Sequence, residues 1–320
     1  MAQAQGSKAY LALQKETTFG VDPGVPALIK IPFSSESIGR TIGLETNDHI
    51  TGNRNNSAPV RGNTDVNGSI SFNLGAYPGE LLLGALGDVD TTGVGPYVHT
   101  IKIGDNLPSF TIEKGFSDIS QFFKYNGCKV GKFSLTSTPA GFQKASIDIL
   151  GAKETASGTS FDATLTDLGD TPFDGFLISS VLEGGGAITG ITEISLMIEN
   201  DLDGDTFTLG SQGTRGSINE GKAKVSGTIK GFFENLTLYN KAVNQTESSL
   251  LVTYQRGTGA GSAGNEFLSF EVPELVYSVK TPAVSGPKGI YYELEFQGYY
   301  GNDADASALI VTLKNTQATL

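Results

Sequence analysis

The stretch Val66-Asn67-Gly68-Ser69-Ile70-Ser71-Phe72 decides the fold of this chain. Apolar residues alternate in it with small or polar ones, which is the period-two pattern of a strand with one buried face. The segment that follows, from Tyr77 to Gly87, has Pro78 near its start, Glu80 in its first turn and a Leu-rich body. These features predict a short helix that ends at the glycine.

The same pattern occurs again about half a chain later. Val225-Ser226-Gly227-Thr228-Ile229-Lys230-Gly231-Phe232 repeats the Val-x-Gly-[Ser/Thr]-Ile strand, and residues 234–243 again have a helical pattern. A strand and helix repeated at this separation predict two copies of one small β domain. We therefore expect a mainly β fold with a first domain and N-terminal arm at residues 1–155, a linker at 156–175 and a second domain at 176–320.

The composition favours strands and excludes several kinds of protein. The 320 residues include 42 Gly, 18 Phe and 11 Tyr but no Trp, which suits strands and turns. The formal net charge of -12 argues against a groove that binds phosphate, because nucleic-acid footprints are basic. No apolar run approaches the roughly 20 residues that span a bilayer, so we expect no membrane contact. The N-terminus lacks a secretion signal and the single Cys128 fits a reducing cytoplasm.

Two long polar loops precede the two repeated strands. Apolar residues are scarce from Glu45 to Asn63, and residues 200–216 have the same character in the second half. Loops of this length inside compact domains are usually functional or disordered. Because the two loops occupy equivalent places, we expect them to share one role.

The reactive side chains form no recognisable catalytic or metal-binding motif. Asp201-Leu202-Asp203-Gly204-Asp205 resembles the start of a calcium loop, but its glycine stands fourth rather than sixth and position twelve is Gln212. A solvated acidic loop fits this stretch better. A Ser-His-Asp or Cys-His site needs His49 or His99, which lie in a polar loop and a predicted strand, and Cys128 suits a small buried position. The sequence thus predicts no enzyme, catalytic residue, cofactor or metal.

The order of several motifs resembles the tail tube proteins of long-tailed bacteriophages, in the subgroup with two tube-type domains in one chain. Each motif is common among strands, so their order carries the resemblance, which covers nearly the whole chain. Besides the repeated strand before a helix, the motifs are Glu16-Thr17-Thr18-Phe19-Gly20-Val21, Pro108-Ser109-Phe110-Thr111-Ile112-Glu113, Tyr125-Asn126-Gly127-Cys128-Lys129-Val130 and Ser195-Leu196-Met197-Ile198-Glu199-Asn200.

The resemblance implies a β-sandwich or half-barrel with one short flanking helix for each domain. It also implies a structural protein of the virion, in which three subunits close into a ring with pseudo-sixfold symmetry. Stacked rings would form the tail tube, an acidic channel through which genome DNA passes without specific binding. The implied partners are further copies of the chain and other tail proteins, namely the tape measure, the tail terminator and the baseplate or tip. Assembly would take place in the host cytoplasm.

The net charge agrees with an acidic channel, since like charge keeps DNA from adhering. Strands of an inner barrel alternate polar residues toward the lumen with apolar residues toward the core. The candidate lumen-facing acids on this logic are Asp148, Glu293 and Glu295, followed by Glu113 and Glu271, with ordinary solvent-facing positions as the alternative. The candidates for contacts between rings are Asp48, His49, Asn53, Arg54, Asn55, Asp201, Asp203, Asp205 and Arg215.

Two other functions compete with a ring-forming structural protein. One is a binding module, such as a capsid decoration protein, and the other is a carbohydrate-active enzyme. An enzyme of that kind needs convergent carboxylates in a cleft, whereas the acids here cluster in loops. The duplication favours a ring, because two equivalent long loops serve a ring better than they serve a single binding site.

Overall fold

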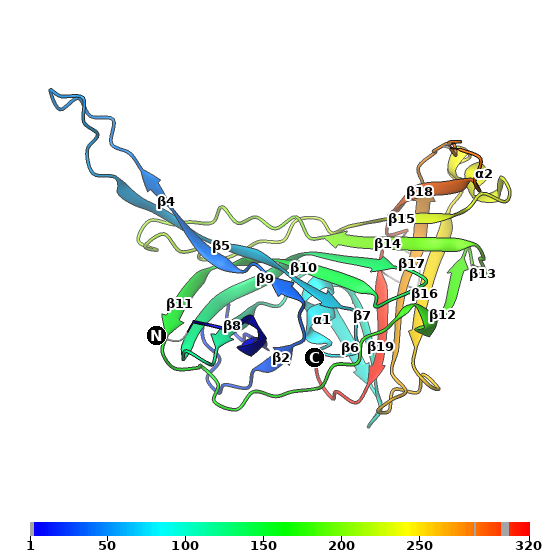
Figure 1. Ribbon diagram of the computed structural model, residues 1–320, viewed down its shortest axis with the longest axis horizontal. Helices are drawn as coiled ribbons and strands as arrows, with labels where there is room; N and C mark the ends of the chain where they lie inside the picture. The colour runs from blue at the N-terminus through cyan, green and yellow to red at the C-terminus, as the bar shows by residue number, and fades with distance from the viewer. Residues whose placement is uncertain (1–2, 285, 302–306) are drawn as a thin grey trace.

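The computed structural model describes residues 3–284, 286–301 and 307–320, and these are mainly β (Figure 1). The strands up to residue 157 are β1 Ala9–Lys15, β2 Ile29–Ile31, β3 Ser35–Glu36, β4 Gly39–Glu45, β5 Val60–Asn73, β6 Gly87–Thr92, β7 Tyr97–Ile103, β8 Phe110–Phe116, β9 Gln121–Ser137, β10 Lys144–Gly151 and β11 Lys153–Ser157. The later strands are β12 Ile178–Glu183, β13 Gly186–Ala187, β14 Ile191–Glu199, β15 Lys224–Phe232, β16 Ser248–Gln255, β17 Phe267–Tyr277, β18 Tyr291–Gly298 and β19 Ile310–Asn315. The helices are α1 Glu80–Leu86 and α2 Thr237–Val243, with 3-10 turns at Gly6–Lys8 and Gly175–Leu177.

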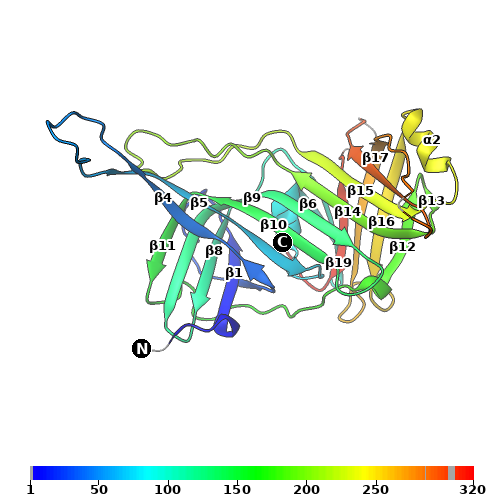
Figure 2. The same cartoon turned by 45° about the horizontal axis from the view of Figure 1, so that its top comes forward.

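One antiparallel sheet contains strands from both halves of the chain, and we call it the shared sheet (Figures 1 and 2). Its order is β4–β5–β10–β9–β14–β15–β18–β17, and β3 lies on the same edge of β5 as β4. Alternate residues of these strands are buried, as expected for a sheet with one face on the core. The buried residues include Val66, Ile70, Phe133, Ile147, Ile198, Ile229 and Leu294.

Further strands continue from the long strands β9 and β17. The first part of β9 leaves the shared sheet and joins the order β2–β1–β8–β9–β11. The strand β17 joins the order β13–β12–β16–β17–β19–β7–β6 in the same way. The C-terminal strand β19 pairs with β7 of the first half as well as with β17.

The same order of pairing occurs twice along the chain. In the first half β4–β5–β10–β9–β8–β1 follow one another, and in the second half β14–β15–β18–β17–β16–β12 do so. Individual residue pairs also correspond between the two halves. Gly151 of β10 lies opposite Val66 of β5, and Gly298 of β18 lies opposite Val225 of β15. A Cβ at either glycine would lie about 3 Å from a valine side chain, so both positions require a close approach.

The halves are joined by hydrogen bonds and by one continuous core. The ladder between β9 and β14 and the ladder between β7 and β19 both cross from one half to the other. Phe133 of β9 stacks on Phe270 of β17 at a centroid distance of 5.9 Å. Residues 156–175 are also packed, because Thr166 pairs with the backbone beside Leu28 and Phe173 is buried. The division at 155 and 176 remains a prediction.

The two predicted helices differ in how much of their surface is covered. Every residue of α1 is buried, whereas only Leu238 and Ala242 of α2 are. The helix α1 is enclosed by residues from the second half, since the Asn200 side chain donates to the Ala85 carbonyl at 2.9 Å and Gln317 donates to Glu80 at 2.5 Å. No comparable cover over α2 occurs among the described residues, and α2 lies at one extremity of the molecule (Figure 1).

The first polar loop is shorter than the sequence predicts. Strand β5 already begins at Val60, and β4 pairs with it as far as Glu45, so the loop covers residues 46–59. The residues from Val60 to Asn63 are mostly exposed and carry no apolar alternation. Backbone pairing with β4 makes them a strand, and side-chain periodicity does not reveal this pairing.

We expect Phe133→Ala to destabilise the whole chain by about 3–5 kcal/mol, because it empties a buried site that contacts both halves. Urea unfolding followed by circular dichroism measures this loss. Phe142→Ala is the matched control, since Phe142 is half exposed and its truncation should cost less than about 0.5 kcal/mol. Two separate unfolding transitions, with only one of them shifted, would contradict a continuous core.

Candidate assembly surfaces

The solvent side of the shared sheet is covered by small polar side chains, and we call it the polar face. Cross-strand register places its residues in rows, because residues directly opposite each other lie on the same face. One row runs through Ser71, Ser146, Ser134, Met197, Ser226 and Gln297. The neighbouring rows add Ser69, Asn73, Asp148, Lys132, Lys144, Thr136, Ser195, Glu199, Thr228 and Glu295.

Three of the predicted lumen-facing acids lie on the polar face. Asp148 is exposed on β10, and Glu293 and Glu295 project from β18 on the side opposite the buried Leu294. Glu271 lies on β17 in the part of that strand that pairs with β16 and β19, and it is therefore outside the shared sheet.

Glu113 is not solvent-facing, which corrects its place among the candidate acids. Its exposed fraction is 1%, and it lies on β8 rather than in the shared sheet. Its carboxylate accepts hydrogen bonds from the hydroxyls of Tyr10 and Ser160, each at 2.7 Å, and from the backbone N–H of Phe161 at 2.6 Å. The carboxylate thus fastens residues 160–162 to the first half. Alternation alone could not identify this role, because the strand bearing Glu113 is covered on both faces.

Most acids on the polar face lie opposite a lysine of the next strand. Lys132 lies between Asp148 and Glu199. Lys230 of β15 bonds Glu193 at 2.6 Å and lies 3.5 Å from Glu293, and Lys280 hydrogen-bonds Glu293 from its other side. Glu295 is the exception, since it lies opposite Thr228.

These contacts shift the pKa values of Lys230 and Glu293. The hydrogen bond to Glu193 raises the pKa of Lys230 above its ordinary value. The hydrogen bond from Lys280 holds the pKa of Glu293 below its ordinary value. Both groups are therefore charged at neutral pH and neutralise one another. The net charge of the chain is consequently not concentrated on the polar face.

The candidate lumen-facing residues predicted from the sequence were all acids, so they did not include the hydroxyl and amide residues of the polar face. Their signal is present in the sequence as short alternations such as Asn67-x-Ser69-x-Ser71-x-Asn73 and Lys132-x-Ser134-x-Thr136. Ordinary solvent-facing strands mix long charged residues with polar ones, whereas these positions hold mainly short hydroxyl and amide groups. Only the register shows that such runs from several strands form one surface.

The β4–β5 hairpin projects from the body of the molecule (Figure 1). Its loop, residues 46–59, contains the exposed candidates Asp48, His49, Asn53, Arg54 and Asn55. Ile50 is 99% exposed in the middle of these polar residues. A single exposed apolar residue is common on protein surfaces, so the projection of the hairpin rather than Ile50 alone marks this loop as a candidate contact.

The second polar loop, residues 200–223, lies along the first half beside β5 (Figure 2). Asp201, Asp203 and Asp205 are exposed on it, but Arg215 is buried. The Arg215 guanidinium forms an ion pair with Asp65 of β5 and donates to the Gly151 carbonyl at 2.8 Å. Arg215 is therefore an anchor within the chain, which corrects its assignment to the exposed contact residues.

The arm motif is fixed to the first half by the carboxylate of Glu16. This carboxylate accepts hydrogen bonds from the side chains of Ser109 at 2.7 Å and Thr111 at 2.9 Å. It also accepts the backbone N–H groups of Gly127 at 2.9 Å and Gly20 at 2.8 Å. Four donors satisfy the buried charge. The motif thus has a structural role in holding the arm against β8 and β9.

A second, partly buried contact ties the two halves together at the 200–223 loop. Lys129 of β9 bonds the Glu220 carboxylate at 2.5 Å, and the same carboxylate accepts the Leu107 N–H at 3.0 Å. Desolvation alone would raise the pKa of Glu220, but the hydrogen bonds from Lys129 and Leu107 outweigh it and hold the pKa below its ordinary value.

The remaining reactive side chains lie in the interior. His99 is buried between Thr91, at 2.8 Å, and the carbonyl of Gln317, at 2.9 Å. Cys128 is buried, and burial raises the pKa of its thiol well above the ordinary value. Within residues 3–284, 286–301 and 307–320 there is no group of acidic, His or Cys side chains suited to a metal ion. Neither helix in the same residues has the length and apolar character needed to cross a membrane.

We expect Arg215→Met to free the 200–223 loop, because the loop loses its ion pair with Asp65 and its bond to Gly151. The free energy of unfolding should fall by about 1–3 kcal/mol. Limited proteolysis should also cut the chain between β14 and β15 faster than in the wild type. Arg54→Met is the control, since Arg54 is exposed at the hairpin tip and should change neither measurement. Equal cleavage rates in both variants and the wild type would show that Arg215 anchors nothing.

The Glu220–Lys129 contact should make stability depend on pH in one direction. A carboxyl whose pKa is lowered by folding stabilises the folded state above its ordinary pKa and loses this effect as the pH falls through the lowered value. Glu220→Gln should therefore lower the urea midpoint at pH 7, and the gap to the wild type should shrink as the pH falls below the ordinary glutamate pKa of about 4.3 and through the lowered value. Asp90→Asn, at an exposed position, controls for the change in net charge. A constant gap between pH 7 and pH 3 would contradict the assignment.

The comparisons with known proteins agree with these features. The family model described as phage tail tube protein matches residues 6–298, which is nearly the whole chain. No curated protein matches the chain. The family is one of structural tail proteins rather than enzymes, and its members build the tube of the virion tail by self-assembly and contact other tail proteins. The chain, with its mainly β fold and continuous polar sheet face, belongs to the phage tail tube protein family.

Proposed function

We propose that the chain assembles into stacked rings of three copies, and that the polar face lines the channel through which DNA is ejected. The observation that carries this proposal is the ladder between β9 and β14, which already joins two like sheets side by side in one chain. Three copies would supply six such sheets and close a pseudo-sixfold barrel. A head-to-tail contact that closes in this way gives a ring rather than a filament.

The chemistry of the polar face suits the passage of a polyanion without adhesion. Phosphates are held where lysines and arginines cluster without acidic neighbours. On this face Lys132 and Lys230 each lie between two carboxylates, so neither presents a free positive charge. The predicted acidic lumen would be lined by this face, on which Asp148, Glu293 and Glu295 lie among lysines, hydroxyls and amides.

The β4–β5 hairpin is the best candidate for contact between successive rings. It projects beyond the body, and its loop carries Asp48, His49, Asn53, Arg54 and Asn55 around the exposed Ile50. Asp201, Asp203 and Asp205 lie on the neighbouring loop and would widen the same contact. The tape measure, the tail terminator and the baseplate or tip would meet the tube at its lumen and its two ends. Assembly would take place in the host cytoplasm.

Negative-stain microscopy of the concentrated protein tests ring formation directly, and we expect rings or hollow tubes. Replacing residues 46–59 with Asn-Gly should leave rings that do not stack, because a two-residue turn directly links the last pair of the hairpin, Glu45 and Val60. Tubes of wild-type length in this variant would contradict the role of the hairpin. A wild-type protein that stays monomeric at high concentration would contradict the ring proposal itself.

A further inference from the structure

We propose that residues 278–281, which follow β17, form the joint between copies by pairing with strand β4 of a second copy of this chain. The inference rests on the proposed ring and names the surfaces that close it. Its partner is a second copy because the chain contains the same joint once already, between β9 and β14.

The joint within the chain gives the template. Lys132 of β9 lies opposite Asp148 of β10 on one side and opposite Glu199 of β14 on the other. The Gly131 carbonyl accepts the Asn200 N–H at 2.8 Å, so β9 is fully bonded on the side of β14. The repeated pairing order then identifies the counterparts of these residues in the second half.

Register assigns the counterparts one by one. Gly298 corresponds to Gly151, so Glu295 corresponds to Asp148, and the N–H of Ser278 bonds the Glu295 carbonyl at 2.8 Å. Ser278 therefore stands where Lys132 stands in the first half.

The second assignment concerns β15 and β5. Val225 of β15 corresponds to Val66 of β5. Because Glu199 pairs with Lys224 and Thr41 pairs with Asp65, Thr41 of β4 stands where Glu199 stands.

The second half has an open edge at the place where β14 covers the first. Because the Ser278 N–H points toward β18, the backbone groups of Val279 and Thr281 point to the opposite side. Along residues 278–281 no strand of the described chain pairs with that side. At the far end of the shared sheet, β4 pairs with β5 on one side, and no other strand within the described residues pairs with its second edge. The two free edges belong to one sheet and match the two strands of the internal joint.

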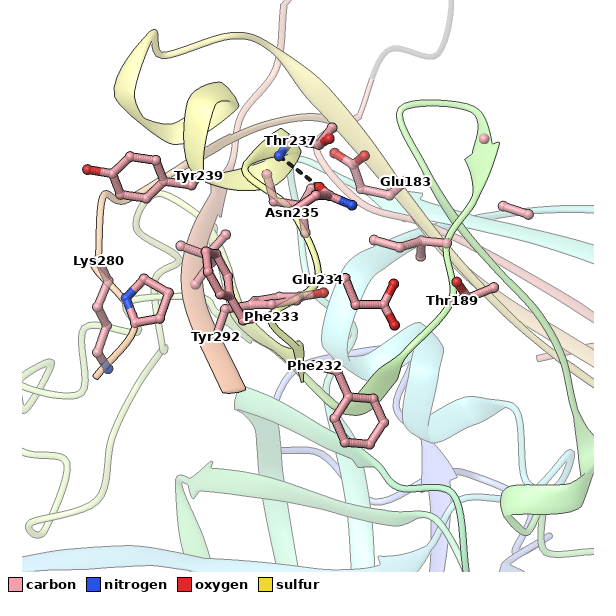
Figure 3. A pocket seen from close by; sticks show the side chains of 16 residues that line it. Glu183, Thr189, Phe232, Phe233, Glu234, Asn235, Thr237, Tyr239, Lys280 and Tyr292 are labelled. Atoms are coloured by element: carbon pink, nitrogen blue, oxygen red, sulfur yellow. Dashed lines mark hydrogen bonds between the residues drawn. The ribbon is translucent and has the colours of Figure 1, made fainter. Parts of the chain in front are cut away.

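The exposure of side chains also indicates that this edge is covered in the first half and open in the second. Phe133, which follows Lys132, is 0% exposed, whereas Val279, which follows Ser278, is 54% exposed. A cavity of about 280 Å³ opens beside Lys280 and is lined by Phe233, Tyr239 and Tyr292 (Figure 3). Leu236, which precedes α2, and Val243, its last residue, are exposed at the same end of the molecule. An apolar edge of this kind on a described monomer is typical of a surface that another chain covers.

A disulfide between copies tests the pairing. Ser278 bonds away from the open side, so Ser278 and Thr41 of the second copy would form a non-hydrogen-bonded pair with Cα atoms about 4.5 Å apart, which a disulfide can bridge. Oxidation of the Thr41→Cys/Ser278→Cys protein should give dimers and trimers on a non-reducing gel. Within one copy these positions lie at opposite edges of the shared sheet, so any such product is intermolecular. Ser278→Cys/Asp90→Cys, with equally exposed thiols off the predicted edge, should give only monomer.

Microscopy of the same samples separates the two proposals. Rings without cross-linked product would overturn the β4 pairing and leave the ring standing, whereas the absence of both rings and product would overturn the ring. Val279→Asp places a charge in the joint and should raise the concentration needed for ring formation at least about tenfold. Val94→Asp is the control, because Val94 is 97% exposed in the β6–β7 turn, away from both edges. Unchanged assembly of Val279→Asp would also overturn the pairing.

Discussion

The fold depends on the antiparallel ladder between β9 and β14. An unpaired strand edge exposes a row of backbone groups that must find partners, and here each of these two strands satisfies the other. The ladder extends one sheet across both halves and places Phe133 against Phe270 of the second half. The core, the polar face and the position of the 200–223 loop all follow from that join. Without this ladder the shared sheet would be divided in two, although β7 and β19 would still pair across the halves.

The duplication gives two halves with one pairing order, and the structure shows a covering strand at the joint of the first half. In the first half α1 is enclosed, Phe133 is buried and the adjacent strand edge is paired. In the second half α2 is largely open, Val279 is exposed and the corresponding edge is free. Both halves share one pairing order, so in the proposed ring a second copy would cover this edge as β14 covers the edge of β9.

On the polar face, much of the charge is paired between neighbouring strands. Lys132 and Lys230 lie opposite carboxylates, whereas Lys144 lies opposite Asn73 and Thr136. The pKa values of Lys230 and Glu293 move in the directions that keep both groups charged. Short hydroxyl and amide groups cover the remaining area. Exposed ion pairs of this kind contribute little stability, so their value lies in cancelling free positive charge. The tail tube family assignment gives such a surface a clear use, because DNA must move along it.

The sequence by itself determined the mainly β class, the repeated strand, the two helices and the family, because alternation, turn residues and motif order are local properties. It also placed Asp148, Glu293 and Glu295 on an exposed face. Only the tertiary structure decided which strand edges are paired, since that depends on residues far apart in the chain. Burial of Glu113 against Tyr10, and of Arg215 against Asp65, arises from such distant contacts. The charge balance of the polar face was equally hidden, because it is set by the register between strands and not by the composition of any one of them.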